Sequence, residues 1–310
     1  MQSMPNILSH QRKPDPLKLA VARCRAMIKA RGTSLNGKAA EMMHWLEELQ
    51  KFALGQFLLV HRGLNGFWTY HLNTVHPKIS NPLRDRQYQQ SPLARFLYET
   101  SPNAVARQER FNYVLQLNQN SLVNNAKIAS IPSGFMGDLL HLDYTGIQNV
   151  QIIGVDFDMA LLQGACHLAR SRGLAGRTKL HHLDAWQLPF RNEFTLISSH
   201  GLNVYVQDEA MYRQLYENFF AALKPGGQLV TSFLTPPPDV DPDSPWNAHV
   251  IDTQALRMQR IIFGDLIGIQ FNVYRQPQAM VKMLQEIGYV DVQIVYDSGC
   301  VFPTLICRKR

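Results

Sequence analysis

From residue 127 onward, the chain alternates short apolar runs rich in β-branched residues with longer stretches that repeat apolar residues at helical spacing. This alternation constrains the fold more than any other feature of the sequence. The short runs lie at 127–131, 150–155, 178–183, 194–198, 228–233, 290–296 and 301–307, and the helical stretches include 159–172, 209–223 and 278–287. Strands that alternate with helices in this way form a parallel sheet with helices on its faces. We therefore predict a doubly wound α/β domain.

The last two predicted strands are separated only by the segment 297–299. A parallel crossover needs a dozen or more residues, so these strands should pair as an antiparallel hairpin at one edge of the sheet. We expect a mostly parallel, seven-stranded sheet with an antiparallel edge strand, in a domain over 126–310. The stretch 235–270 begins rich in proline and aspartate and is expected to be an insertion in that domain. Loops of this kind at the carboxyl edge of a sheet commonly shape substrate pockets.

The first part of the chain, 1–125, is predicted to be mainly helical. Its charge also differs, since residues 1–127 carry 17 Lys and Arg against 7 Asp and Glu, whereas residues 128–310 carry 14 against 17. A basic first part indicates either a solvated surface or an anionic partner, such as an acidic small molecule, a membrane surface or RNA. Nucleic acid is compatible with this charge, but no basic run or binding motif supports it. The helical stretches lie at 16–31, 36–60, 93–100 and 103–120.

Composition argues against several classes of protein. The four cysteines are scattered and form no C-x-x-C pair, which argues against a zinc knuckle and a disulfide scaffold, and we predict no metal site. The most apolar early stretch, 52–60, is too short to cross a bilayer, and the first residues lack the apolar core of a signal peptide. We therefore expect a soluble protein with a cytoplasmic location.

A turn of small residues follows the first predicted strand. Ser133, Gly134 and Gly137 lead into a helix that should begin near Asp138. In an open α/β sheet the ligand lies beyond the carboxyl ends of the strands, and glycine lets the backbone approach it closely. Taken alone, this spacing is as typical of an ordinary strand–helix turn as of a cofactor loop.

Acidic residues follow the second predicted strand. Asp156 lies about 20 residues after the glycine turn, a position from which a carboxylate can accept hydrogen bonds from both ribose hydroxyls of a nucleotide. Asp158 precedes the helix that begins at Met159, so it can act as a helix N-cap. The two interpretations are compatible, with Asp156 on the ribose and Asp158 or Met159 beside the adenine.

Two further motifs complete the pattern: D-A-W-Q-L-P-F at 184–190 and L-K-P-G-G at 223–227. In the second motif, Pro225 and the two glycines suit the end of a helix, so its value lies in its position between the fourth and fifth strands. The turn, the acidic end of the second strand and these two motifs occur in the order typical of class I, Rossmann-like S-adenosylmethionine-dependent methyltransferases. The chain resembles that family over about its C-terminal three-fifths.

The resemblance implies methyl transfer from S-adenosylmethionine to a small-molecule acceptor, with S-adenosylhomocysteine as product. Asp184 would accept a hydrogen bond from the adenine amino group, with Ala185 and Trp186 beside the ring. The segment 198–205 would face the transferred methyl group. That placement makes Ser199 and His200 candidate cofactor contacts, Asn203 and Tyr205 candidate substrate contacts, and His200 and Tyr205 candidate catalytic residues.

The ordinary pKa of histidine suits a general base at neutral pH, but His200 could equally contact only the cofactor. The chain also departs from the family at the first strand. The family usually has an acidic residue there, whereas this sequence has Ser130 and Pro132. The residue that would hold the methionine amino group of the cofactor is therefore not identified by the sequence.

An aromatic cluster stands out in the first part of the chain, at Arg62, Asn65, Phe67, Trp68 and Tyr70. An arginine among aromatic rings can hold a carboxylate and cover an adenosyl group, but a small aromatic core explains the pattern as well. We take Trp68 and Tyr70, with Trp246 from the expected insertion, as candidate substrate contacts.

Two other functions compete with methyl transfer. An NAD-linked oxidoreductase would require a full G-x-G-x-x-G motif, which the first turn lacks, and no antiparallel final strand. A degenerate methyltransferase fold that binds cofactor, RNA or a protein partner without catalysis is compatible with the altered first strand and the basic first part.

Overall fold

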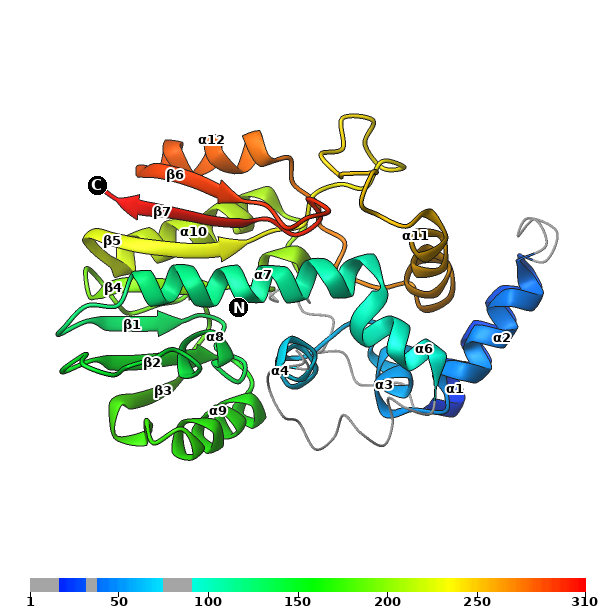
Figure 1. Cartoon of the computed structure of the whole chain (residues 1–310), viewed down its shortest axis with the longest axis horizontal. Helices are drawn as coiled ribbons and strands as arrows, with labels where there is room; N and C mark the ends of the chain where they lie inside the picture. Colours follow the sequence, from blue (N-terminus) through cyan, green and yellow to red (C-terminus); the bar gives the residue numbers. More distant parts are fainter. Residues whose placement is uncertain (1–16, 32–37, 75–90) are drawn as a thin grey trace, which may run out of the picture. The chain divides into compact units, whose positions relative to one another are not determined.

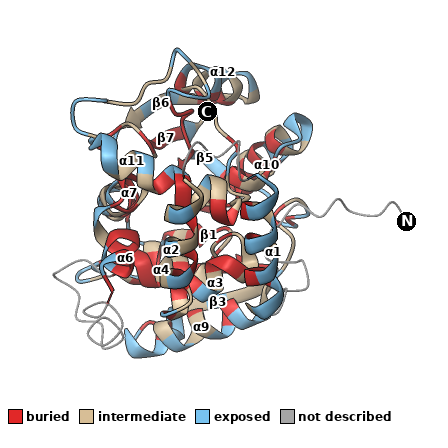
Figure 2. Ribbon diagram, turned by 90° about the vertical axis from the view of Figure 1, so that its right-hand side faces the viewer, coloured by how far each residue is buried: buried red, intermediate tan, exposed pale blue. Residues whose placement is uncertain are grey.

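The structure is a computed structural model that describes residues 17–31, 38–74 and 91–310. It divides into two compact units (Figure 1). We call residues 1–105 together with 248–272 the helical unit, and residues 106–247 together with 273–310 the sheet unit. In both units the helices bury one side and expose the other, as Figure 2 shows by colour.

The helical unit is built around one apolar core that includes Leu46, Leu58, Ile262 and Leu266. Its helical segments are α1 Leu17–Ala30, α2 Ala39–Leu49, α3 Ala53–His61, α4 Gly66–Thr74, α6 Pro92–Arg95, the π-helical turn η2 Phe96–Thr100, α11 Thr253–Gln259 and the π-helical η5 Arg260–Ile267.

The predicted single helix over 36–60 is wrong, because the chain forms two helices, α2 and α3, over its described part; residues 36 and 37 lie outside the described residues. Phe52 is extended between them, with φ −141° and ψ 153°. Gly55 then packs so closely on the preceding helix that a Cβ atom would lie 2.1 Å from the carbonyl oxygen of Leu49. Only glycine allows that approach, and helical periodicity does not reveal the break.

The sheet unit contains one seven-stranded sheet in the order β3-β2-β1-β4-β5-β7-β6. Strands β1 to β5 pair in parallel, and β7 is antiparallel to both β5 and β6. The predicted doubly wound α/β fold and the terminal hairpin are therefore confirmed. The reversed strand is β7, one place in from the edge, and the edge strand β6 runs in the same direction as the parallel strands. The strands are β1 Lys127–Ser130, β2 Gln151–Asp156, β3 Thr178–His182, β4 Phe194–Ser199, β5 Leu223–Ser232, β6 Tyr289–Val295 and β7 Thr304–Lys309.

Most residues of β1, β2 and β4 are buried, as expected for parallel strands covered on both faces. The strand order reverses between β1 and β4, which places the topological switch point there. Besides most of α7 Pro102–Asn120, which begins in the helical unit, the helices of the sheet unit are α8 Gly137–Leu140, α9 Met159–Ser171, η3 Ala175–Arg177, η4 Asn203–Tyr205, α10 Glu209–Ala222 and α12 Pro277–Ile287.

The domain limits differ from the predicted division at 125/126. The boundary falls inside α7, at 105/106, because the later part of α7 bonds to the sheet: the Asn118 amide donates to Ser198 Oγ at 3.0 Å. The expected insertion 235–270 is divided as well. Residues 248–272 belong to the helical unit, where Ile262 and Leu266 enter the core, while 235–247 stay with the sheet unit.

Candidate functional site

The turn after β1 crosses to the end of β2. The backbone amide of Ser133 donates to the carbonyl of Val155 at 2.8 Å, and the amide of Gly134 donates to Asp156 Oδ2 at 2.8 Å. Gly134 and Met136 both adopt left-handed backbone conformations, with φ 48° and 57°, before Gly137 starts α8. The structure thus brings the predicted turn and the predicted carboxylate together.

Asp156 is only 7% exposed, and both of its carboxylate oxygens accept backbone hydrogen bonds. Besides the Gly134 amide on Oδ2, the amide of Asp158 donates to Oδ1 at 2.9 Å. An ionised carboxylate accepts hydrogen bonds on both oxygens and is therefore the kind of acceptor that the hydroxyl groups of a ligand require. Asp158 itself caps α9, as its side chain accepts from the amides of Ala160 and Leu161, which confirms the predicted N-cap.

Two apolar side chains beside this carboxylate are exposed, Phe157 by 54% and Met159 by 51%. The Phe157 ring lies 5.6 Å from the ring of His182, whose Nε2 is 2.9 Å from the Phe157 carbonyl oxygen. Exposed apolar groups next to a hydrogen-bonding carboxylate suit a ligand with a flat ring and hydroxyl groups. Sequence reasoning included Met159 but missed Phe157, although it lies between the two aspartates.

The end of β3 repeats the local pattern seen at Asp156. Asp184 Oδ1 accepts from the amide of Trp186, two residues on, at 2.9 Å. The indole N–H of Trp186 donates to the carbonyl of Met211 at 2.9 Å, and Asn218 donates to the carbonyl of Trp186 at 2.8 Å. These bonds anchor Trp186 to α10, while Ala185 beside it is buried. The predicted contacts of these residues with adenine stay predictions.

His200 follows β4 and lies between two serine hydroxyls. Its Nε2 is 3.0 Å from Ser198 Oγ, and its Nδ1 is 3.0 Å from Ser232 Oγ. Burial, and to a smaller extent the nearby Arg110 guanidinium, hold the pKa of His200 well below its usual range. Because both ring nitrogens are occupied, the geometry disfavours the predicted general-base role. Ser199 is buried, and its carbonyl accepts from the Thr231 hydroxyl at 2.8 Å.

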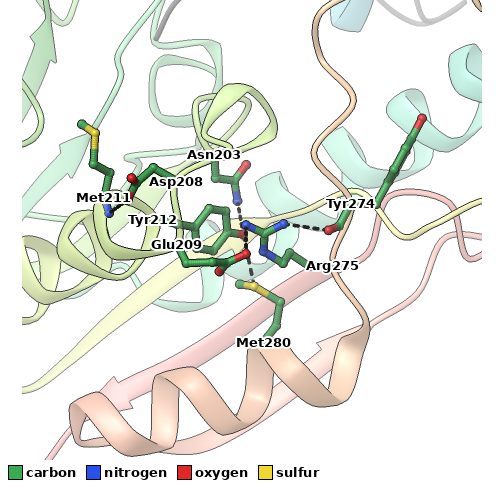
Figure 3. Close-up of polar contacts among 8 residues, drawn as sticks. All are labelled: Asn203, Asp208, Glu209, Met211, Tyr212, Tyr274, Arg275 and Met280. Carbon is green, nitrogen blue, oxygen red and sulfur yellow. Dashed lines mark hydrogen bonds and ion pairs between the residues drawn. The ribbon is translucent and has the colours of Figure 1, made fainter. Parts of the chain in front are cut away.

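Asn203 is 4% exposed and belongs to a polar cluster that includes two tyrosines (Figure 3). Its amide nitrogen donates to the Tyr216 hydroxyl at 2.7 Å and to the Ser232 carbonyl at 2.8 Å. Figure 3 shows its oxygen pointing away from this cluster, and that oxygen has no hydrogen-bond partner among the described residues. Tyr205 lies at the end of η4, where its amide donates to the Leu202 carbonyl at 3.2 Å.

Arg275 is a charged residue of this region that sequence reasoning missed. Its guanidinium lies 4.4 Å from the centre of the Tyr212 ring, donates to the carbonyl of Tyr274, and pairs with Glu209 at 2.8 Å (Figure 3). The Tyr212 hydroxyl in turn donates to Met280 Sδ at 3.1 Å. No local pattern reveals this contact, because Arg275 and Tyr212 lie far apart in the sequence.

The remaining predicted substrate contacts are Trp246, Trp68 and Tyr70. Trp246 is half-buried, and its indole N–H donates to Thr235 Oγ1 at 2.9 Å. Trp68 and Tyr70 belong to the helical unit, where Trp68 is buried with its ring 5.3 Å from Phe67. These contacts favour the packing role weighed for the aromatic cluster, and the predicted substrate contacts stay predictions.

Arg62 of the same cluster donates through Nε to the carbonyl of Gly268 at 2.8 Å, within the helical unit. Across the described ranges, no three side chains of His, Cys, Asp or Glu gather as a metal-binding group would. A search of the same residues finds no helix with the length and apolar character that a membrane span requires.

The comparisons with known proteins agree with this geometry. A family model described as a methyltransferase domain matches residues 133–227, from the first turn to the L-K-P-G-G motif. A solved structure from Bordetella parapertussis, described as a possible exported protein, shares 39% sequence identity at a TM-score of 0.88, over 94% of this chain and 95% of that one. No curated protein matches the sequence.

The S-adenosylmethionine-dependent methyltransferase SibL shares the fold, with 12% identity and a TM-score of 0.51 over 67% of this chain and 56% of that one. The fold and the motif order agree with the family match, and residues 133–227 form a methyltransferase domain of the class I, Rossmann-like type.

Proposed function

We propose that the protein transfers the methyl group of S-adenosylmethionine to a small-molecule acceptor and releases S-adenosylhomocysteine. The observation that carries this proposal is the juxtaposition of Asp156 with the turn after β1 through the Gly134 amide. Asp184 follows β3, the next strand of the sheet. The ends of adjacent parallel strands thus offer one carboxylate for ribose hydroxyls and a second for an adenine amino group, in the place where open α/β sheets bind ligands.

The residues present fit such a cofactor. In the proposed complex, Asp156 accepts from the ribose, Asp184 accepts from the adenine amine, and Phe157 and Met159 pack on the base. Bound S-adenosylmethionine supplies an electrophilic methyl group on a sulfonium. The chain's own contribution is orientation of the acceptor and exclusion of water, the two effects that favour a displacement of this kind.

The acceptor is proposed to be a small molecule, and an anionic one suits the basic character of residues 1–127. Tyr205 remains the candidate for assisting proton removal, since the ring nitrogens of His200 are both engaged. We also propose a cytoplasmic location. Recovery of the native protein outside the cytoplasm in a cell fractionation would contradict that location.

Calorimetric titration of the full chain tests the cofactor. We expect S-adenosylmethionine and S-adenosylhomocysteine to bind, and NAD to show no binding. A chain that binds NAD but neither sulfur compound would overturn the proposal. Catalysis is tested separately with S-adenosylmethionine labelled on its methyl group, offered with panels of carboxylates, amines, phenols and phosphate esters.

A second function, cofactor binding without catalysis, is favoured by one observation, the replacement of the usual acidic residue of the first strand by Ser130. The same two experiments separate the functions. Tight binding of S-adenosylhomocysteine without methyl transfer to any class of small molecule, RNA or protein would favour the binding module.

A further inference from the structure

The carboxylate of Asp138, a residue of α8, lies at the end of β1. Asp138 lies in the first turn of α8, and the Ser130 hydroxyl donates to its carboxylate, with oxygen distances of 2.9 and 3.0 Å. Ser130 pairs in register with Ser198 of the neighbouring strand β4. The Asp138 carboxylate therefore bonds to the end of β1, beside the topological switch point between β1 and β4, where α/β sheets bind ligands.

A buried polar network continues from the β4 end of the switch point. Ser198 Oγ accepts from the Asn118 amide at 3.0 Å and lies 3.0 Å from His200 Nε2. The other ring nitrogen of His200, Nδ1, lies 3.0 Å from the Ser232 hydroxyl. Arg110 Nη1 donates to that hydroxyl at 3.3 Å. The network thus joins the exits of β4 and β5 beside Asp138.

Asp138 nevertheless lacks a cationic partner. No Lys, Arg or His nitrogen lies within 4 Å of its carboxylate in the described part of the chain, where the ion pairs join other residues. The neighbouring titratable groups are Tyr144, which its charge affects, and, through the serines, His200 and Arg110. Burial raises the pKa of Asp138 to about 6, so the carboxylate is ionised at pH 8 but weakly stabilised. A partly buried anion of this kind gains from the arrival of a positive charge.

We propose that Asp138 receives the ammonium group at the amino-acid end of the cofactor. The proposal rests on the proposed function. Asp138 is half-buried, and it lies at the switch point, next to the turn that carries Ser133 and Gly134. Neither Ser130 nor Pro132 can supply the carboxylate that holds this ammonium group. Asp138 of α8 supplies it instead.

The test compares two ligands that differ in this end alone. S-adenosylhomocysteine carries the ammonium group, whereas 5′-methylthioadenosine keeps the nucleoside and the thioether but lacks the amino-acid part. In calorimetric titrations at pH 8, Asp138→Asn should lower the affinity for S-adenosylhomocysteine about 10- to 100-fold, the range for a lost hydrogen bond to a charged group. Binding of 5′-methylthioadenosine should change less than threefold. Asp143→Asn, the same change at an exposed aspartate of the following segment, should alter neither affinity.

Two further measurements keep the outcome decisive. In the wild-type chain, the affinity for S-adenosylhomocysteine should fall about tenfold from pH 8 to pH 5 as Asp138 protonates, while 5′-methylthioadenosine should bind equally at both pH values. Adding Ser130→Asp to the Asp138→Asn variant should recover part of the lost affinity.

The possible failures are distinguishable. If the wild-type chain binds neither ligand, the proposed function falls, and this inference with it. If the wild-type chain binds both, and the folded Asp138→Asn variant retains full affinity for S-adenosylhomocysteine, only the role of Asp138 is overturned. Equal losses for the two ligands would also overturn it, because they would indicate a damaged turn rather than a lost ammonium contact. If Asp138→Asn does not fold, wild-type affinity for S-adenosylhomocysteine that is the same at pH 8 and pH 5 overturns it in the same way.

Discussion

The ends of β2 and β3 and the exits of β4 and β5 are built by different kinds of contact. At β2 and β3, Asp156 and Asp184 each accept from the backbone amide two residues further on. At β4 and β5, His200 bonds to Ser198, two positions away, and to Ser232, 32 positions away, while Asn203 bonds to residues 9, 13 and 29 positions away. At the first two strand ends, backbone amides orient a carboxylate, whereas at the other two the side chains bond mainly to other side chains.

The largest effect is expected on ligand affinity, when Asp156 at the end of β2 is substituted. Replacing Asp156 with Ala removes the proposed ribose acceptor and releases the Gly134 amide, so the affinity for S-adenosylhomocysteine should fall about 100-fold or more. Titration calorimetry gives the affinity, and a thermal melt shows whether the fold is kept. A folded variant with unchanged affinity would remove Asp156 from the site.

The second effect concerns stability at the β4 exit. Asn203→Ala leaves the buried Ser232 carbonyl without a donor and opens a small cavity, so the free energy of unfolding should fall by about 2 to 4 kcal/mol. Tyr216→Phe, which removes only the hydroxyl partner of Asn203, should cost about 1 kcal/mol. Denaturant unfolding measures both values. A smaller loss for Asn203→Ala than for Tyr216→Phe would contradict the central position given to the amide.

The third effect is a gain, not a loss, in the free energy of unfolding. The pKa of Asp138 is raised to about 6, so the folded state disfavours the ionised form, and the resulting penalty builds up as pH rises from about 4 to 6 and is fully present above 6. Asp138→Asn should therefore raise the free energy of unfolding by about 1 to 3 kcal/mol at pH 8 relative to wild type. The gain should vanish near pH 4. Denaturant unfolding at the two pH values checks this prediction, which fails if the variant is the less stable protein at pH 8.

A smaller effect is expected at Asp158. Its side chain caps α9, so Asp158→Ala should lower the free energy of unfolding by about 1 kcal/mol. Asp208→Ala removes the equivalent cap of α10 and should cost about the same. Affinity for S-adenosylhomocysteine should change less than threefold in either variant. A tenfold loss confined to Asp158→Ala would instead assign that side chain to the ligand.

The smallest effect concerns the protonation of His200, which tests the side-chain network directly. Its pKa lies well below the usual range, so the ring should stay neutral from pH 8 down to pH 5.5. Nitrogen NMR of labelled histidine should show a neutral ring in one tautomer over this range, because each ring nitrogen bonds to a serine hydroxyl. Titration of His200 near pH 6.5 would contradict the buried position given to the ring.

The same comparison explains how far the sequence could predict the molecule. The alternation of strands with helices, the terminal hairpin and the positions of Asp156 and Asp158 follow from periodicity and from short offsets, which a single sequence displays. The contacts of Arg110 and Asn118 join residues 122 and 80 positions apart, and no local pattern carries such information. The break at Phe52 was missed because apolar spacing continues across it, and Arg275 was missed because its partners come from another part of the chain.

The division of the chain between the units has a consequence for synthesis. The core of the helical unit includes Ile261, Ile262, Leu266 and Ile267, which are translated only after most of the sheet unit. The first 105 residues therefore emerge from the ribosome with an incomplete core and expose apolar helix faces until residue 272 has followed. A fragment that ends at 105 or 125 should aggregate, whereas one in which 248–272 is joined to it by a flexible linker should be recovered in folded form.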